Sequence, residues 1–161
     1  MKQILRSDEV SQLSQSLKTQ NSKIVLVGGC FDILHVGHIA LLESAKQQGD
    51  VLIVLLESDA TIAKTKGNGR PLHTQEQRAT VLQALKSVDY VVLLNPHMTN
   101  EDYDNLVKLI QPDIIATTIN DPGWEHKERQ AKLVGAELRA VTQPINNVST
   151  SRIVTQLHKE L

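Results

Sequence analysis

Two histidines with the spacing of a phosphate site lie near the start of the chain. His35 and His38 flank Gly37 in segment 29–38, which reads GCFDILHVGH. The β-branched apolar run at 24–27 precedes this segment, and a helical pattern over 39–48 follows it. The segment is therefore predicted to join a strand to a helix, and helix N-termini offer backbone N–H groups and partial positive charge to anions. Both imidazoles can reach one anion from the first helical turn.

The pattern Gly-x-Phe-Asp-x-x-His-x-Gly-His resembles the signature of the cytidylyltransferase-like nucleotidyltransferases. That resemblance implies transfer of a nucleoside monophosphate from an NTP to a phosphorylated small molecule, with release of pyrophosphate. Within the family, residues 23–38 are most similar to the adenylyltransferase domain of ADP-heptose synthase, and the chain is also similar to the glycerol-3-phosphate cytidylyltransferase group. The favoured substrates are ATP and a heptose-type sugar 1-phosphate.

This reaction needs positioning and charge neutralisation rather than an activated serine or cysteine, because the attacking oxygen belongs to the acceptor's phosphate. The resemblance implies four catalytic residues: His35, His38, Lys66 and Arg152. Lys66 lies in the glycine-rich basic stretch at 64–71, which is predicted to be a mobile loop. Arg152 belongs to segment 148–153, VSTSRI, which resembles a second family motif and should begin a helix.

Further site residues follow from the same resemblance. Asp32 and Arg70 are predicted to bind the acceptor, although Asp32 could instead anchor its loop. Phe31 also has the character of a core residue. The residues predicted to bind the nucleotide are Gly29, Cys30, Phe31, Gly37, Arg78, Ser149, Thr150 and Ser151.

The similarity weakens in the loop at 117–124, which lacks the lysine that heptose-type enzymes carry there. Asn120 and Trp124 are candidates for contact with the base, and Trp124 could equally be a packing residue. The departure leaves open CTP with glycerol 3-phosphate or another phosphoalcohol, and ATP with FMN. In a different class, a non-catalytic nucleotide-binding regulator also remains open.

A metal site built by the protein is not expected. Cys30, His35 and His38 could be imagined as zinc ligands, but the sequence offers no fourth candidate at a suitable spacing. Mg²⁺ bound mainly through the NTP phosphates is the expected cofactor.

Composition limits the remaining classes. The 161 residues, of which 40% are hydrophobic, predict a single domain, with an N-terminal helix within 1–22 and a catalytic core at 23–161. A net charge of −1 without a basic tract argues against a nucleic-acid partner. The apolar runs are too short to cross a membrane, and one cysteine with no signal-like start predicts the cytoplasm. Similarity to the family favours a homo-oligomer, with a dimer preferred.

Strand and helix patterns alternate along the whole chain. Apolar runs at 24–28, 51–56, 88–94, 113–117 and 138–141 predict five strands, each followed by a helical pattern. Thr74 and Gln77 form a capping box that should open one of these helices. The predicted fold is a doubly wound, Rossmann-like α/β domain, with a five-stranded parallel sheet and helices on both faces.

Overall fold

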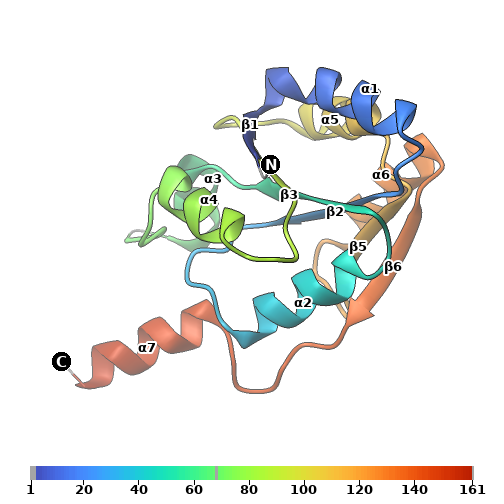
Figure 1. Cartoon of the computed structure of the whole chain (residues 1–161). Helices are drawn as coiled ribbons and strands as arrows, with labels where there is room; N and C mark the ends of the chain where they lie inside the picture. Colours follow the sequence, from blue (N-terminus) through green and yellow to red (C-terminus); the bar gives the residue numbers. More distant parts are fainter. Residues whose placement is uncertain (1–2, 68, 161) are drawn as a thin grey trace.

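The computed structural model describes residues 3–67 and 69–160, and it contains a parallel sheet of six strands in the order β1-β4-β3-β2-β5-β6 (Figure 1). Asn68, part of the predicted mobile loop, lies outside the described residues, as do the first two residues and the last. The strands are β1 Gln3–Arg6, β2 Ile24–Gly29, β3 Val51–Leu56, β4 Tyr90–Leu93, β5 Ile114–Thr118 and β6 Glu137–Thr142. The helices are η1 Ser7–Glu9, α1 Val10–Thr19, α2 Val36–Lys46, α3 Asp59–Lys66, α4 Gln75–Gln83, α5 Asn100–Ile110, α6 Trp124–Val134 and α7 Thr150–Glu160.

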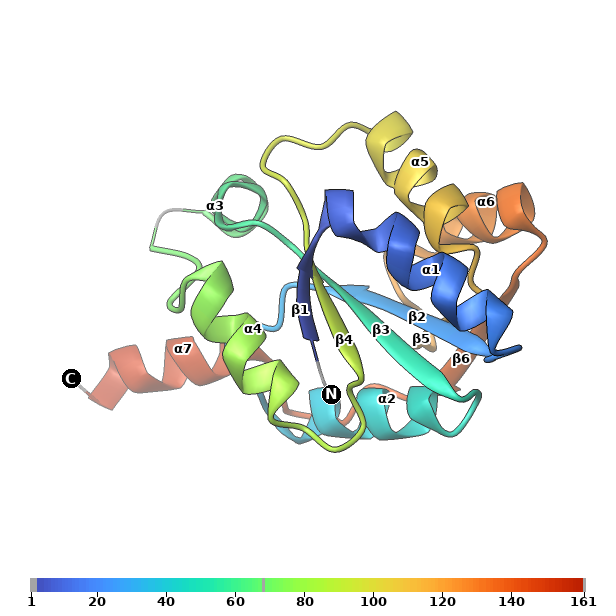
Figure 2. The ribbon, with the colours of Figure 1, turned by 45° about the horizontal axis from the view of Figure 1, so that its top comes forward.

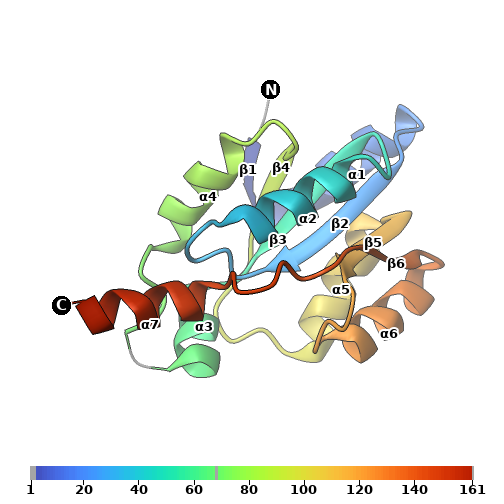
Figure 3. The ribbon, with the colours of Figure 1, turned by 90° about the horizontal axis from the view of Figure 1, so that it is seen from below.

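Helices cover both faces of the twisted sheet, as predicted. Helices α1, α5 and α6 pack together on one face, whereas α2 and α4 pack on the other (Figures 1 and 2). The C-terminal helix α7 projects away from the sheet beyond the α2 face, and the long segment after β6 leads to it (Figure 3). The order of the strands reverses at β2, so ligands are expected at the carboxyl ends of β2 and its neighbours.

Alternation along β2 explains why the strand is apolar throughout. Ile24 and Leu26 belong to the core under α1, α5 and α6, whereas Val25 and Val27 belong to the core under α2 and α4. Successive side chains of a strand point to opposite faces, so a strand covered on both sides must be apolar at every position. This burial fixes the strand whose end carries the histidine segment.

The sheet has one strand more than the five predicted. Strand β1 lies at the edge of the sheet and pairs in parallel with β4 from Gln3 to Arg6. The chain start therefore forms a strand before η1 and α1, and is not part of a single N-terminal helix. Leu5 is well buried in this strand, at 8% exposure, while Ile4 is 36% exposed, so the apolar signal is weak.

Local sequence signals explain several element boundaries. The predicted capping box at the start of α4 is present, with the Gln77 backbone N–H donating to Thr74 and the Gln77 side chain accepting from the Thr74 backbone. Helix α4 ends at Gln83. Helix α3 extends to Lys66, into the segment that was predicted to be a loop. Across residues 3–67 and 69–160, no helix combines the length and apolar character needed to cross a membrane.

Candidate active site

The histidine segment connects the end of β2 to the start of α2. His35 is the N-cap of α2, and its side chain accepts a hydrogen bond from the Gly37 backbone N–H at 3.2 Å. Because the bond uses Nδ1, the neutral ring carries its proton on Nε2, which is left as a donor. A Cβ on Gly37 would lie 3.0 Å from Cε1 of His35, so glycine allows the ring to fold over the helix start.

The two imidazoles lie against each other. Their ring centroids are 3.8 Å apart and the planes differ by 21°, while the ring of Phe31 lies 5.0 Å from that of His38. Phe31 is buried at 4% exposure and has a left-handed φ of 47°, a conformation that is rare for a bulky residue. A Cβ on Gly29 would lie 2.8 Å from the Phe31 ring. The predicted nucleotide contact of Phe31 is thus limited to its backbone, because its ring supports His38.

Both imidazoles are held in the neutral state. Burial, reinforced by the neighbouring His35, lowers the pKa of His38 to about 4, and burial also lowers the pKa of His35. The Nδ1 atom of His38 is buried and makes no hydrogen bond to any residue that the structure describes. A neutral imidazole keeps one N–H, which can donate to phosphate oxygens as negative charge develops there.

The second motif meets the first across the fold. The Thr150 hydroxyl, in the first turn of α7, donates to the Ile33 carbonyl at 3.1 Å. Ser149 caps the same helix, accepting from the Arg152 backbone N–H at 3.2 Å. Ser151 and Arg152 are exposed, and the Arg152 guanidinium donates to the Asn147 side chain at 2.7 Å. The structure therefore joins Thr150 to the histidine segment, whereas the Arg152 side chain turns to its own loop.

Asp32 anchors the loop that follows α3. Its carboxylate is 3% exposed and accepts from Arg70 Nε at 2.6 Å and from the backbone N–H groups of Leu72 and His73. Burial alone would raise the pKa of Asp32, but the hydrogen bond from Arg70 and the two backbone bonds lower it. Of the two roles left open for Asp32, the geometry favours the anchor. Direct contact of Asp32 and Arg70 with the acceptor remains a prediction, since the two side chains are paired with each other.

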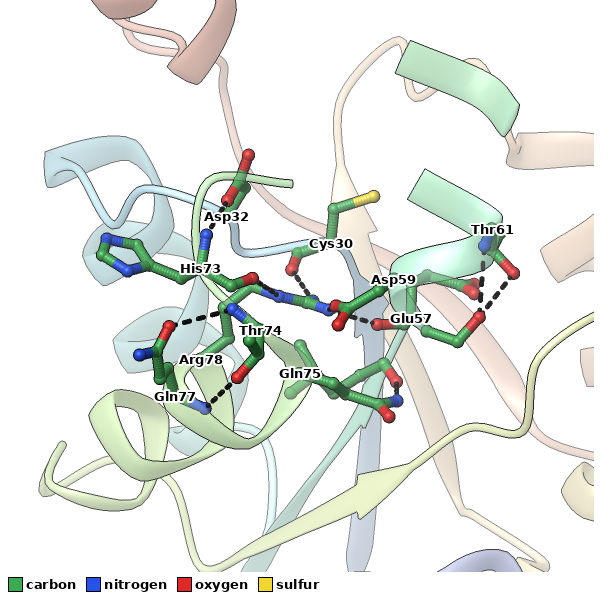
Figure 4. A network of polar contacts seen from close by, with 12 residues as sticks. Cys30, Asp32, Glu57, Asp59, Thr61, His73, Thr74, Gln75, Gln77 and Arg78 are labelled. Carbon is green, nitrogen blue, oxygen red and sulfur yellow. Dashed lines mark hydrogen bonds and ion pairs between the residues drawn. The ribbon is translucent and has the colours of Figure 1, made fainter. Parts of the chain in front are cut away.

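Arg78 lies at the centre of a network of polar contacts that includes Cys30, Glu57, Asp59 and His73 (Figure 4). Only 2% of the residue is exposed, and its guanidinium donates to the carbonyls of His73, Cys30 and Glu57 and to the Asp59 carboxylate, at 2.6–3.1 Å. These bonds tie the start of the histidine segment to β3, α3 and α4. The predicted nucleotide contact of Arg78 would require it to leave four bonds, so this structure gives it a supporting role.

Lys66 is the last residue of α3, and its side chain is exposed. Its charge acts on Cys30: burial and the Glu57 charge raise the pKa of this thiol, while Lys66 and Arg78 oppose the rise. The net shift is upward, so Cys30 is a neutral thiol at neutral pH. Lys66 lowers the pKa of the Cys30 thiol, so its charge lies within electrostatic range of the start of the histidine segment.

A cavity of about 340 Å³ opens on the opposite face of the sheet from α2, where the carboxyl ends of β2 and β3 meet α5 and α6. Gly29 and Cys30 line it, so it adjoins the histidine segment. Glu57 lies on its wall, and both oxygens of this carboxylate accept from the Tyr103 hydroxyl, at 3.0 and 2.8 Å. Sequence reasoning missed both residues, although Glu57 directly follows β3, a position at which α/β folds bind ligands.

The loop at 117–124 regains a cation from the helix that follows it. Lys127, on α6, pairs with Asp121 at 2.7 Å, and Asp121 also accepts from the Thr117 hydroxyl and the Gly123 backbone N–H. Burial would raise the pKa of Asp121, but the bonds from Lys127, Thr117 and Gly123 lower it. Lys127 is thus the cation paired with this loop in the structure. Asn120 and Trp124 are exposed and do not line the cavity, so their contact with a base stays a prediction.

The described residues contain no group of three or more His, Cys, Asp or Glu side chains arranged to hold a metal ion. Cys30, His35 and His38 thus do not form such a group in this structure.

A parallel α/β sheet with paired histidines at the switch strand is the architecture of a nucleotidyltransferase. The chain belongs to the cytidylyltransferase-like family, which it matches over residues 26–156. The bifunctional protein HldE of Aliarcobacter butzleri is 36% identical over 152 residues, and that of Wolinella succinogenes is 38% identical over 157. These alignments cover 94 and 96% of this chain but only 30 and 31% of the relatives, so the chain spans less than a third of their length.

Two solved structures share the fold. The lipopolysaccharide core biosynthesis protein of Thermoplasma volcanium GSS1 superposes with a TM-score of 0.60 and 28% identity, over 77% of this chain and 97% of that one. The pantoate-beta-alanine ligase of Francisella tularensis, solved with a β,γ-ATP ligand and beta-alanine, has a TM-score of 0.65, over 99% of this chain and 78% of that one. Its 17% identity indicates likeness of fold alone.

Proposed function

We propose that this nucleotidyltransferase transfers AMP from ATP to a heptose-type sugar 1-phosphate and releases pyrophosphate. The observation that carries the proposal is the pair of stacked, neutral imidazoles at the start of α2, joined by Thr150 to the second motif. The HldE relatives and the lipopolysaccharide core biosynthesis protein support a sugar phosphate as the acceptor.

In the proposed reaction, an oxygen of the acceptor's phosphate forms a bond to the α-phosphorus, and the bond from that phosphorus to the bridging oxygen breaks. Pyrophosphate leaves with the electron pair. Nε2–H of His35 and an N–H of His38 donate to the phosphate oxygens as their charge grows, and the ammonium of Lys66 approaches the leaving group. Fixed donors of this kind lower the barrier because they need no reorganisation during the reaction.

Mg²⁺ fits this site as a cation held mainly by the nucleotide. The carboxylate at the centre of the segment, Asp32, is committed to Arg70 and two backbone N–H groups, whereas triphosphate oxygens are ligands that Mg²⁺ prefers. When bound, the ion would neutralise charge on the phosphates. The chain's own residues would hold and orient the nucleotide around it.

A second candidate is CTP with glycerol 3-phosphate or another phosphoalcohol. The loop at 117–124 supports it, because this loop lacks the lysine that heptose-type enzymes carry there and the nearby Lys127 on α6 is paired with Asp121. ATP with FMN uses the same core. A non-catalytic regulator agrees less well with the geometry, because binding alone does not need both histidines, Lys66 and Thr150 together.

The test is pyrophosphate release measured for each of ATP, CTP, GTP and UTP with each of heptose 1-phosphate, glycerol 3-phosphate, phosphocholine, phosphopantetheine and FMN. The proposal predicts release with ATP and heptose 1-phosphate well above every other pair. Release with CTP and glycerol 3-phosphate would instead select the second candidate, and nucleotide binding without any release would select the regulator. Light scattering in the same buffers would test the proposed homodimer.

A further inference from the structure

The cavity beside the histidine segment has a chemistry unlike that of a phosphate site. Its floor is apolar and includes Leu26, Leu55 and Ile115, which rise from three neighbouring strands. Its polar side chains are Glu57, Asn100, Tyr103, His126, Lys127 and Gln130. Among the described residues that line it, Glu57 is the only carboxylate. A Cβ built on Gly28 meets no atom within 4 Å, so the strand end here faces open space.

Glu57 retains the capacity to accept hydrogen bonds from a ligand. Its two oxygens share the single proton of the Tyr103 hydroxyl, whereas an ionised carboxylate has about four acceptor positions. Burial raises the pKa of Glu57, against the lowering by Tyr103, Arg78 and Lys127. Its backbone N–H donates to the Gly29 carbonyl at 3.1 Å, and its carbonyl accepts from Arg78, so the main chain at this position is fixed on both sides.

These features decide which part of a substrate fits the cavity. A carboxylate repels phosphate, so the phosphates belong with the histidines. Hydroxyl groups are donors and acceptors at once, and a carboxylate, two side-chain amides and a phenol could bind several of them together. A purine offers a single exocyclic amine to the carboxylate, which would leave most of these groups unpaired. The apolar floor suits the C–H face of a sugar ring.

We propose that Glu57 and Tyr103 form an acceptor-recognition pair that binds hydroxyl groups of the sugar while its phosphate lies by the histidines. The inference rests on the proposed function for the identity of the acceptor, and on the cavity for the roles of the two residues. Tyr103 fixes the orientation of the carboxylate and can itself contact the ligand. Neither residue takes part in the transfer of the nucleotidyl group.

The test compares Glu57→Gln and Tyr103→Phe with the native enzyme and with Glu43→Gln. Glu43 is exposed on α2, on the other face of the sheet, so it controls for loss of one charge. For heptose 1-phosphate, KM and the Kd from calorimetry should rise about 10-fold or more in both variants, the scale of one hydrogen bond to a charged group. KM and Kd for ATP should stay within about twofold, and kcat should change less than the acceptor KM. Melting temperatures identify a variant that fails to fold, and Tyr103→Phe removes only one oxygen atom.

Deoxy sugar 1-phosphates make the assignment specific. For one deoxy analogue, the acceptor KM of the native enzyme should rise as much as the KM of Glu57→Gln rises with the parent sugar. The two increases should not add when the variant is given the analogue, because both changes remove the same hydrogen bond. A rise confined to the ATP constants would place the nucleobase in the cavity and overturn the proposal, as would unchanged constants for both substrates. If the native enzyme used only glycerol 3-phosphate, the proposed function would fail separately, and the same comparison with that acceptor would still test the pair.

Discussion

The hydroxyl of Thr150 donates to the carbonyl of Ile33 across 117 positions of sequence. The same carbonyl raises the pKa of His38, against the lowering by burial. Among the described residues, this bond links the start of α7 to the histidine segment. Because α7 otherwise projects from the sheet, this one bond sets where the helix begins relative to the imidazoles (Figure 1).

Loss of this bond should impair the reaction more than the fold. We expect Thr150→Val to lower kcat/KM for the NTP about fivefold, which corresponds to the ~1 kcal/mol of an ordinary hydrogen bond. Thr155→Val is the matched control, because the Thr155 hydroxyl donates only within its own helix, to the Ser151 carbonyl. Steady-state kinetics on both variants would check this, and equal effects would mean that the bond to Ile33 has no special part.

Removal of the His38 ring should act on the chemical step. We expect His38→Ala to lower kcat at least ~100-fold, the scale of losing one donor to the transition state. The far-ultraviolet circular dichroism spectrum should remain native. His158→Ala, on the exposed part of α7, is the control. A near-normal kcat in His38→Ala would remove the phosphate role assigned to this residue.

The sequence predicted most of the architecture because strands β2 to β5 form apolar, largely buried runs that alternate with helical patterns. Strand β1 was not predicted, because its apolar residues Ile4 and Leu5 are adjacent and do not produce the alternating pattern of a strand. The same limit applies at Arg78, where the helical pattern indicates an ordinary surface arginine while the fold buries it against three carbonyls. Burial of a charge depends on loops that are distant in sequence, so local patterns do not reveal it.

In the candidate site too, the sequence predicted residues that are close together in the chain but not the contacts between distant positions. The residues of the 29–38 segment were predicted as a group because their spacing is local, and the structure brings His35 and His38 together. The contact between Glu57 and Tyr103 joins positions 46 apart, and the ion pair of Lys127 with Asp121 joins α6 to the loop before it. Neither relationship has a sequence period, although the place of Glu57 after a buried strand was a usable signal.

The neutral state of His38 predicts how stability depends on pH. Its folded pKa of about 4 lies below the ordinary value of 6.5, so the unfolded chain binds more protons between these values. The stabilisation of the folded state by the neutral His38 ring is fully present above pH 6.5 and is lost as the pH falls toward 4. The lowered pKa of His35 acts in the same direction. The melting temperature of the native protein should fall between pH 7 and pH 5, and by less in His38→Gln. Equal slopes for the two proteins would contradict the burial of a neutral ring.

Arg78 should matter more for stability than for nucleotide affinity. Replacement by leucine leaves the carbonyls of Cys30 and Glu57 without a donor, at ~1–3 kcal/mol for each buried unpaired group. We expect chemical denaturation to show a loss of about 3 kcal/mol or more, and Arg78→Lys to recover part of it. Arg129→Gln, which breaks a surface pair with Asp104, should cost less than about 1 kcal/mol. A stable Arg78→Lys with a strongly raised KM for ATP would restore the direct nucleotide contact predicted from sequence.

Lys66 is the site cation with the greatest freedom to move, because it ends α3, is exposed, and precedes Gly67 at a left-handed φ of 92°. A flexible ammonium can close on a triphosphate, so we expect Lys66→Ala to lower kcat ~100-fold, while Lys64→Ala, two residues earlier and also exposed, has little effect. Hydrogen exchange of peptides spanning 64–71 should slow when NTP is added to the native enzyme, and should slow less in Lys66→Ala. The Asp32 and Arg70 pair holds the far end of this segment, so closure should be greatest near Gly67. Unchanged exchange together with a normal kcat in Lys66→Ala would make Lys66 a solvent-exposed charge with no part in the reaction.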